Sequence, residues 1–371
     1  MKRRTIIFAM AIGIATLLSC AKSKQTENYN FNSAPAILHL SIGSNNNLST
    51  KSNTKNPNSG SKAIGEGHGV QSNDNIVQSL DIFIFRNEEN ADKEKLESYE
   101  NLSGAKLGSL NNISIKATTG KKIIYVVANS HISNLSTIKN LSDFKQLESS
   151  LLLENSSNFT MLGNTEVNLE PQTSITINVE RLAARVQLSS ISENFDGTAY
   201  QGQSLKNIKI YLINAHAKKI LYNGASLNSP FIINNKKAVA SDYSSAAMSG
   251  IVYDNGPSSI SNALYSNPHY FYTYENTLST ENATNRFTRL VIQADLDGTT
   301  YYYPININQE GYGYTASNGH KGIKRNTTYN IACTIKGIGS LNPDEPIQKS
   351  TATISISVSN WLTVPTLNYE F

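Results

Sequence analysis

Hydrophobic and polar positions alternate over residues 36–42 (AILHLSI), near the beginning of the chain. Ala36, Leu38, Leu40 and Ile42 fall on one side of this segment, which is the pattern of a strand with one buried face. A polar stretch rich in Ser and Asn follows and ends in SKAIGEGHG at residues 61–69. Such a stretch is typical of an exposed linker that proteases cut. A buried strand on a cuttable linker predicts a strand that is removed.

Short runs of strand-forming residues recur along the rest of the chain, separated by Gly, Asn and Asp. The run 76–86 (IVQSLDIFIFR) predicts a strand, and the continuously apolar run 123–128 (IIYVVA) predicts a strand covered on both faces. The runs 290–296 and 299–307 flank the dipeptide Asp297-Gly298, which is a strong hairpin signal. These patterns predict a mainly β protein.

One stretch predicts a helix instead. Residues 141–153 (LSDFKQLESSLLL) carry an apolar stripe that includes Phe144, and Ser142 or Asp143 can cap the first turn. No comparable helix pattern occurs in the second half of the sequence. We therefore expect a mixed α+β first half and an all-β second half, with a boundary near residues 180–181.

The last strand pattern, TISISVS at residues 353–359, alternates Ile354, Ile356 and Val358 with polar residues. Trp361 breaks this alternation, which indicates a bulge or bend. Apolar positions continue through the tail LTVPTLNYEF.

Length and charge narrow the possibilities. A chain of 371 residues is long enough for two domains. The formal charge of +4 is concentrated in residues 1–62, whose eight basic residues and one acid give +7, so the remainder carries 4 − 7 = −3. A mildly acidic remainder argues against nucleic-acid binding, which needs a clustered basic face.

The first residues have the pattern of a targeting segment. A basic start at residues 2–4 precedes an apolar run at 6–18, which is shorter than the about 20 residues of a membrane-spanning helix. The run ends in LLSC, which resembles a bacterial lipobox in which Cys20 is acylated; the alternative is an ordinary signal peptide that ends near a cysteine. The second cysteine, Cys333, then has no partner, so we expect neither a disulfide framework nor a metal cluster, and a buried Cys333.

Residues for catalysis are not apparent. The six histidines do not pair with one another, with Cys or with acids at ligand spacing, so we expect no metal site, no cofactor and surface or groove positions for them. The glycines at 65, 67 and 69 do not have the strand and helix context of a phosphate loop, and no nucleophile elbow occurs. The Tyr-rich runs 270–274 and 301–303 have two interpretations, sugar stacking and structural packing. The sequence therefore predicts a protein that is not an enzyme.

Several strings, in this order, resemble one family: SKAIGEG, KKIIYVVANSH, the segment 142–153, NFTMLG, ERLAARVQL, DGTTYYYPININQEGYGY, IKRNTTYNIACTIKGIGSLNPDEP and VSNWLTVP. Together they resemble the fimbrillins, the type V pilus subunits of bacteroides-like bacteria, and most closely the FimA-type major subunits. The resemblance covers about residues 36–371.

The resemblance implies a mainly β fold with two β-sandwich-like, transthyretin-like domains, the first with a short helix. It implies a lipoprotein signal peptide at 1–19 and a propeptide at 20–62 that contains the removable strand 36–42. The two fimbrillin domains are then expected at 63–180 and 181–371.

It also implies a maturation route. The chain is expected to reach the outer membrane as a lipoprotein through Cys20, and to be cut between Lys62 and Ala63 by a trypsin-like surface protease. The cut removes the first strand, and a C-terminal strand of a neighbouring copy fills the groove in an extracellular fimbria. The expected donor segment is 353–371, with Ile354, Ile356, Val358, Leu362, Val364, Leu367 and Phe371 as its alternating apolar positions.

The cut site departs from the family pattern, in which Arg takes the first position. This chain has no Arg between Arg4 and Arg86, so a protease that accepts Lys is expected, with Lys51 and Lys55 as further sites. Expected partners are further copies of the chain, anchor and tip subunits, the maturation protease, and host or bacterial surface receptors. The alternatives are an anchor or tip subunit, or a surface glycan-binding lipoprotein.

Overall fold

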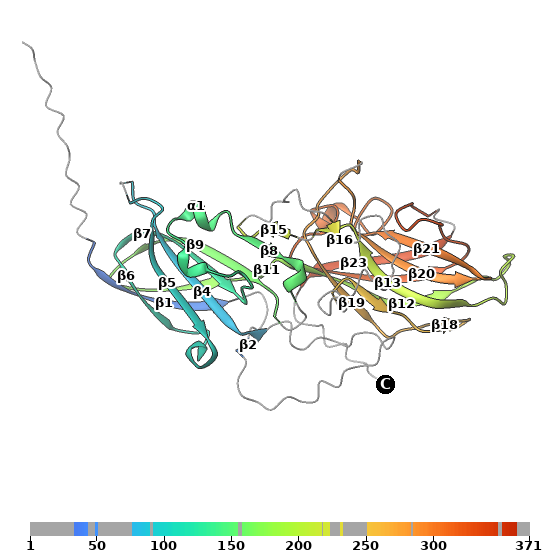
Figure 1. Ribbon diagram of the computed structural model, residues 1–371, viewed down its shortest axis with the longest axis horizontal. Helices are drawn as coiled ribbons and strands as arrows, with labels where there is room; N and C mark the ends of the chain where they lie inside the picture. Colours follow the sequence, from blue (N-terminus) through green and yellow to red (C-terminus); the bar gives the residue numbers. More distant parts are fainter. Residues whose placement is uncertain are drawn as a thin grey trace, which may run out of the picture. The chain divides into compact units, whose positions relative to one another are not determined.

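The computed structural model describes residues 33–43, 49–50, 76–89, 92–154, 158–216, 218–222, 231–232, 251–282, 285–347 and 351–361. From Ala34 onward the described residues belong to one compact unit. Strands dominate its secondary structure (Figure 1). The mainly β class expected from the sequence is therefore confirmed.

Two sheets form the first half of this unit. One has the order β10 (Gln172–Asn178), β1 (Pro35–Gly43) and β6 (Ile113–Thr118). The other has the order β11 (Glu180–Arg181), β9 (Met161–Leu169), β7 (Gly120–Ala128), β4 (Ser79–Arg86) and β5 (Leu96–Ser103). Strands β2 (Ser49–Thr50) and β3 (Ile76–Val77) pair with each other and form a separate two-stranded sheet.

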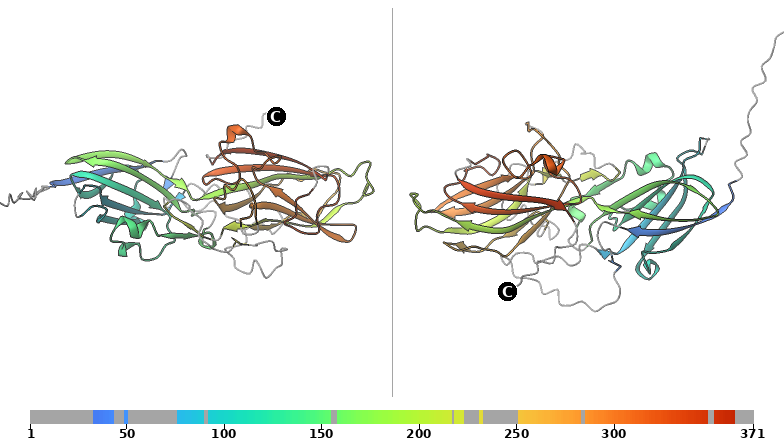
Figure 2. Two further views of the ribbon diagram at one scale, coloured as in Figure 1. Left: turned by 90° about the horizontal axis from the view of Figure 1, so that it is seen from above. Right: turned by 180° about the vertical axis from the view of Figure 1, so that it is seen from behind.

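An apolar layer joins these two sheets into a sandwich. It takes side chains from β1, including Leu38 and Leu40, and from one face of the five-stranded sheet, including Ile82, Ile124 and Val126. The blue strand β1 lies in the three-stranded layer in Figure 1 and in both views of Figure 2.

The opposite face of the five-stranded sheet is covered as well. Every residue of Ile123–Ala128 in β7 is buried, which confirms the two-sided burial predicted from this apolar run. Phe144 covers this face, with ring centroids 4.5 Å from Tyr125 and 5.1 Å from Phe83. Aromatic rings at these separations attract one another, which adds to the stabilisation from burying their apolar surface.

The predicted helix over residues 141–153 is wrong for most of its length. Helix α1 covers only Leu141–Phe144, and its cap is Asn140, whose side chain accepts a hydrogen bond from the Asp143 amide at 2.9 Å, in place of the predicted Ser142 or Asp143. Strand β8 (Glu148–Ser150) and a 3-10 turn, η3 (Leu151–Leu153), follow. The reason is long-range pairing, because β8 pairs antiparallel with β15 (Lys218–Ile220), about 70 residues later.

Two further sheets form the second half. The first has the order β19 (His269–Tyr274), β12 (Ala183–Glu193), β22 (Thr327–Ile335) and β23 (Ala352–Asn360). The second has the order β17 (Tyr253–Asn255), β13 (Leu205–Ile213), β20 (Arg289–Leu296) and β21 (Thr299–Asn306), and β18 (Ser259–Ile260) also pairs with β13. The remaining elements are β14 (Ala215–His216) with its partner β16 (Phe231–Ile232), and the 3-10 turns η1 (Gly104–Leu107), η2 (Leu135–Thr137) and η5 (Ala316–Asn318).

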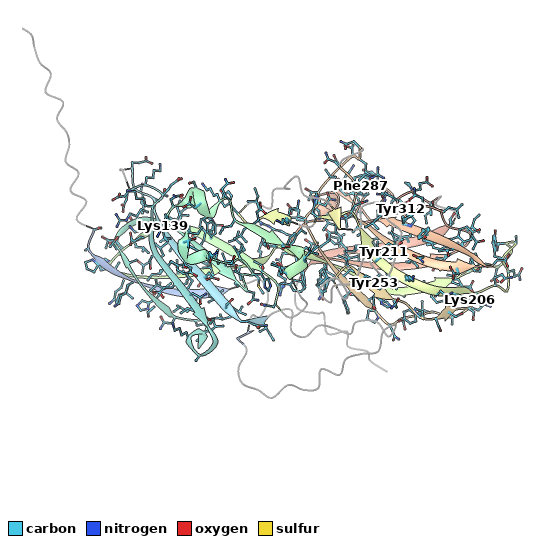
Figure 3. All side chains as sticks on the ribbon, viewed as in Figure 1. Lys139, Lys206, Tyr211, Tyr253, Phe287 and Tyr312 are labelled. Atoms are coloured by element: carbon cyan, nitrogen blue, oxygen red, sulfur yellow. The ribbon has the colours of Figure 1, made fainter. Side chains whose placement is uncertain are left out.

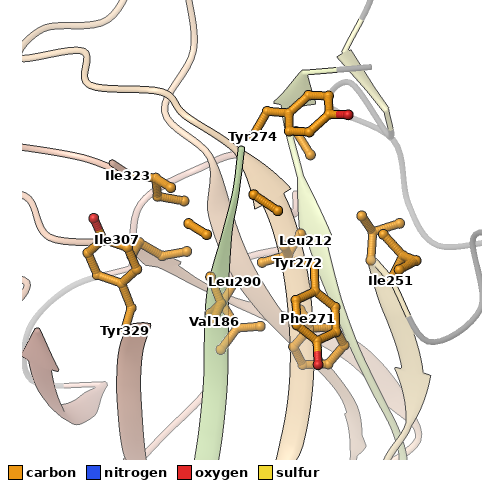
Figure 4. Packing of buried hydrophobic residues seen from close by; sticks show 14 of the residues in the cluster. Val186, Leu212, Ile251, Phe271, Tyr272, Tyr274, Leu290, Ile307, Ile323 and Tyr329 are labelled. Carbon is orange, nitrogen blue, oxygen red and sulfur yellow. The ribbon is translucent and has the colours of Figure 1, made fainter. Parts of the chain in front are cut away.

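The core of the second half is apolar and rich in aromatic side chains. Figure 4 shows Val186, Leu212, Phe271, Leu290 and Tyr329 pointing into it from both sheets, and each is fully buried. At the β13–β17 pair, the rings of Tyr211 and Tyr253 lie with centroids 6.5 Å apart (Figure 3).

The Asp-Gly hairpin is confirmed. Strands β20 and β21 end and begin on either side of Asp297 and Gly298, and their register pairs Leu296 with Thr299. Both turn residues have positive φ, 50° and 77°. A two-residue hairpin of this kind requires that conformation, which Asp tolerates and Gly adopts without strain.

One pair of sheets gives way to the other near residues 180–183, within a single compact unit, and the domain boundary expected near 180–181 stays a prediction. Strand β11 is hydrogen-bonded to β9 in the first half, and β12 begins at Ala183 in the second half. Only Leu182 separates the two strands, and it is buried.

The alternating burial of β1 generates a stability prediction. Leu40 is fully buried, whereas Ile37 on the opposite face of the same strand is 42% exposed. We expect Leu40→Ala to lower the free energy of unfolding of the uncut chain by about 2–5 kcal/mol, because it leaves a cavity. The matched change Ile37→Ala should cost about 0.5 kcal/mol or less. Urea unfolding of the two variants tests this, and equal losses would contradict the assigned faces.

His216 generates a prediction about pH. Burial, with a smaller effect of the Lys219 charge, lowers the pKa of His216 to about 4 from 6.5. The unfolded chain therefore takes up a proton between these values while the folded chain does not, so stability is complete above about pH 6.5 and falls toward about pH 4. We expect His216→Gln to show a shallower loss of stability over this range in thermal unfolding. An identical loss in both proteins would contradict the role of His216.

Candidate assembly site

Strand β1 is paired on both of its edges. It runs antiparallel to β6, from Pro35 opposite Thr118 to Leu40 opposite Ile113. It runs parallel to β10, from Ile37 opposite Gln172 to Gly43 opposite Asn178. Since β6 and β10 each bond to β1 and not to one another, removing β1 leaves two unpaired strand edges that face each other across the width of one strand.

Hydrogen bonds also hold both ends of β1. At its start, the Thr119 amide donates to the Ala34 carbonyl at 2.9 Å, and the Ala34 amide donates to Thr119 Oγ1 at 3.0 Å. At its end, the Val179 amide donates to the Gly43 carbonyl at 2.9 Å. The segment from Ala34 to Gly43 is therefore bonded throughout its length and is not a loosely associated arm.

One face of β1 supplies the side chains that the sequence singled out. Leu38 and Leu40 are completely buried, and Ala36 and Ile42 nearly so, which confirms the predicted alternation. Burying the three larger side chains contributes about 5–9 kcal/mol. That these residues are removed during maturation stays a prediction.

Beneath β1 lies an apolar floor. Val77, Leu80, Ile82, Ile124 and Val126 are buried in the same cluster as the β1 side chains. Without β1 this floor becomes the bottom of a groove whose two walls are β6 and β10. A groove with an apolar floor and unpaired edges binds an alternating strand by β-augmentation.

A buried charge network fixes one wall of this groove. Glu97 accepts hydrogen bonds from the Thr118 amide at 2.6 Å and from Arg86 Nε at 3.2 Å. Lys122, whose side chain is completely buried, places Nζ 3.2 Å from Glu97 and 3.3 Å from Glu88. Buried charges are stable only when they are paired and hydrogen-bonded. None of these contacts involves β1, so the end of β6 has support in addition to its pairing with β1.

The C-terminal strand lies in the other half. Strand β23 pairs antiparallel with β22 at the edge of its sheet. The predicted donor residues Ile354, Ile356 and Val358 lie on this strand and are half-buried against the core. They are therefore paired within their own chain, at a site distinct from the groove around β1.

A second buried charge network anchors the chain just before β23. Asp344 accepts hydrogen bonds from Asn214 Nδ2 at 3.0 Å and from Arg286 Nε at 3.0 Å, and it also pairs with Arg289. The Arg289 side chain is fully buried. Sequence reasoning noted the string NPDEP without assigning this role, and the local signal was two acids between two prolines.

Other predicted residues lie outside the described ranges. These are the lipidation site Cys20, the cleavage residues Lys62 and Ala63, the further sites Lys51 and Lys55, the glycine run at 65–69, and the tail positions Leu362, Val364, Leu367 and Phe371.

Within the described ranges, no group of three or more His, Cys, Asp or Glu side chains is arranged to hold a metal ion. Cys333 is buried, as predicted, and burial raises the pKa of its thiol to about 12. The expected surface positions of the histidines are wrong for His216 and His269, which are buried. His269 is held by Asp254 at 2.6 Å, a pairing between β19 and β17 that spacing along the chain did not indicate.

The Tyr-rich runs are structural. Tyr270, Tyr272 and Tyr274 of β19 are buried, as are Tyr302 and Tyr303 of β21. Rings enclosed in a core cannot stack on a sugar, so these runs give no support to a glycan-binding site. No helix in the described part of the chain is long and apolar enough to span a membrane.

Family models match most of the chain. The model of the major fimbrial subunit protein FimA matches residues 45–214, and the model of the FimA4 pilin C-terminal domain matches residues 202–361. Both models describe FimA-type subunits. Together they cover residues 45–361, from just after β1 to Trp361.

Individual relatives agree with these models. The major fimbrium subunit FimA type-2 of Porphyromonas gingivalis is 22% identical over 412 residues, which cover 98% of each chain. The major fimbrium subunit FimC of the same species is 25% identical over 315 residues, covering 82% of this chain but only 62% of FimC.

A solved structure shows the same fold. The crystal structure of a fimbrilin from Porphyromonas gingivalis W83 matches with a TM-score of 0.59 at 17% identity, covering 90% of this chain and 98% of that one. Together with the family models and the sequence relatives, this likeness leads to one conclusion: the chain belongs to the FimA-type fimbrillin family.

Proposed function

We propose that this chain is a structural subunit of an extracellular fimbria and that it polymerises by strand exchange. In this scheme β1 is removed by proteolysis, and the C-terminal strand of a neighbouring copy takes its place between β6 and β10. The single observation that carries the proposal is the position of β1, which comes first among the described strands and yet is central in its sheet.

The position of β1 in the sequence makes it removable. A cut between Lys62 and Ala63 separates β1 from β3 and all later strands, so the remaining chain stays continuous. The buried pairing of Lys122 with Glu97 and Glu88 holds the β6 end without help from β1. The emptied groove then keeps its wall and floor and is ready to bind a strand, which lowers the ordering cost of assembly.

The donor proposed is the segment 353–371. Its apolar positions repeat every second residue, as they do in β1, so they can fill the same floor. A contact between the groove of one copy and the tail of the next is head-to-tail, and such contacts produce open filaments. Before the cut, β1 occupies the groove and prevents assembly inside the cell.

Export and location follow from the same scheme. We infer that acylation at Cys20 anchors the precursor to the outer membrane, and that a Lys-accepting surface protease releases it. The fibre would support adhesion and biofilm formation, with anchor and tip subunits as further partners. A chain that has both a removable first strand and an alternating tail suits the shaft of the fibre better than its anchor, which keeps the first strand, or its tip, which lacks a donor.

Limited trypsin treatment tests activation. We expect the uncut protein to stay monomeric and the treated protein to form filaments in electron microscopy, with a new N-terminus at Ala63. Lys62→Ala should move the cut to Lys51 or Lys55, which also lie after β1, and delay filament formation, whereas Lys51→Ala should leave the new N-terminus at Ala63 unchanged. If filaments purified from cells consist of subunits that begin at Cys20, activation by cleavage is refuted.

A truncated chain tests the donor. A protein that ends at Asn360 keeps the groove and residues 353–360 but lacks Trp361 and residues 362–371, so after cleavage it should accept a strand normally and donate a shortened strand that binds weakly. Mixed with intact cut protein, it should shorten the filaments in proportion to its share, measured by light scattering and microscopy. Filaments of normal length from the truncated chain alone would show that the tail after Asn360 is not the donor.

A further inference from the structure

We propose that Trp361 is the latch that holds the C-terminal strand on its own chain until assembly. This inference rests on the proposed function and adds its regulation. The donor segment proposed above includes β23, yet β23 is paired with β22 in the same chain. For donation to occur, residues 352–361 must first leave this position, so the contacts that hold them there oppose assembly.

Strand β23 has less support than the inner strands of its sheet, although it is paired with β22 along its whole length. It is an edge strand with a partner on one side only. The inward residues Ile354, Ile356 and Val358 are half-buried, and the residues between them are exposed. A strand with one backbone partner and a half-covered face is among the first parts of a domain to open.

Trp361, in contrast, is 1% exposed and is enclosed by four side chains. The ring of Tyr272 stacks on it with centroids 5.6 Å apart, and the ring of Phe159 meets it edge-on at 5.2 Å. The guanidinium carbons of Arg181 and Arg185 lie 4.7 Å and 5.2 Å from the indole centroid. A cation near a Trp face is attracted to it, and most strongly where water is excluded. Trp361, which directly follows β23, is therefore more completely enclosed than the apolar residues of the strand.

These four side chains form a socket around Trp361, and two hydrogen bonds support it. The Trp361 amide donates to the Asn326 carbonyl at 2.8 Å, and Arg181 Nη1 donates to the Asn326 side chain at 3.3 Å. Phe159 and Arg181 come from the first half of the chain, and Tyr272 from the second. Trp361 thus joins the end of β23 to both halves at once.

The chain just before β23 is held by buried contacts. Asp344, paired with Arg286 and Arg289, keeps the chain before β23 in place. Ile347 is also buried. In the proposed release, residues 351–361 swing away from β22 while the chain up to Ile347 stays in place, and the contacts of Trp361 must break for this to happen.

A reversible disulfide tests whether the strand leaves. Thr327 and Asn360 are directly opposite in the β22–β23 register, and opposed residues of an antiparallel pair are close enough for a disulfide. The full chain with Thr327→Cys, Asn360→Cys and Cys333→Ala is oxidised and treated with trypsin. We expect cleavage without filaments, and filaments after dithiothreitol is added. Normal filament growth from the oxidised protein would overturn both the latch and the use of this strand as donor.

Changes of Trp361 test the latch itself. We expect Trp361→Ala to speed filament growth of the cut protein by about tenfold, because the cation–π and aromatic contacts that oppose release are lost. The growth rate of Trp361→Phe should lie between those of the unmodified protein and Trp361→Ala. Leu290→Ala is the control, since it removes a fully buried side chain from β20, which is not part of the socket; it should lower the melting temperature without speeding growth.

The outcomes separate the two proposals. If the disulfide blocks growth but Trp361→Ala and Trp361→Phe grow at the unmodified rate, β23 is released and Trp361 is not its latch. If Trp361→Ala does not fold, Trp361→Phe still decides, because it keeps most of the volume and weakens the attraction to the arginines. Faster growth of Leu290→Ala, equal to that of Trp361→Ala, would show that general destabilisation is the cause and would overturn the latch.

Discussion

The backbone of β6 and the backbone of β10 both depend on a strand between them. These strands bond to β1 and not to each other, and an apolar floor lies beneath the position that β1 occupies. An empty place of this kind exposes unpaired amides and carbonyls together with apolar surface, and both are costly in water. The first half of the molecule is therefore complete only when some strand fills this place, whether it comes from the same chain or from another.

The second half presents the complementary problem. Its C-terminal strand is at the edge of a sheet and is half-covered, but its two ends are held by very different means. Asp344 lies among buried arginines before the strand, and Trp361 is enclosed by aromatic rings and arginines after it. Under the proposed scheme, the Asp344 network would keep the chain before the strand in place while the contacts of Trp361 are released.

Local patterns in the sequence predicted the features that depend on neighbouring residues. The alternation at Ala36–Ile42, the continuous apolar run 123–128 and the Asp297-Gly298 turn each appear in the structure as expected. In each case the signal and its structural consequence lie within a few residues of one another. The family resemblance supplied the pairing of groove and donor, which local periodicity does not contain.

The features that were missed arise from contacts between distant segments. Residues 148–150 carry a helical pattern, but pairing with 218–220 makes them a strand. His269 is buried because Asp254 faces it, and Asp344 is buried because Arg286 and Arg289 enclose it. The socket of Trp361 draws on residues more than a hundred positions apart. Spacing along one sequence does not reveal such partners.

Hydrogen exchange at the amides of β6 and β10 tests the central claim most directly. The amides that bond to β1 should be protected in the uncut chain, should exchange rapidly once trypsin has cut and assembly is held back by dilution, and should regain protection in filaments. The amides of β4 and β7, which bond only within their own sheet, should remain protected throughout. Unchanged protection of β6 and β10 after the cut would contradict the account, because it would mean that β1 had not left the groove.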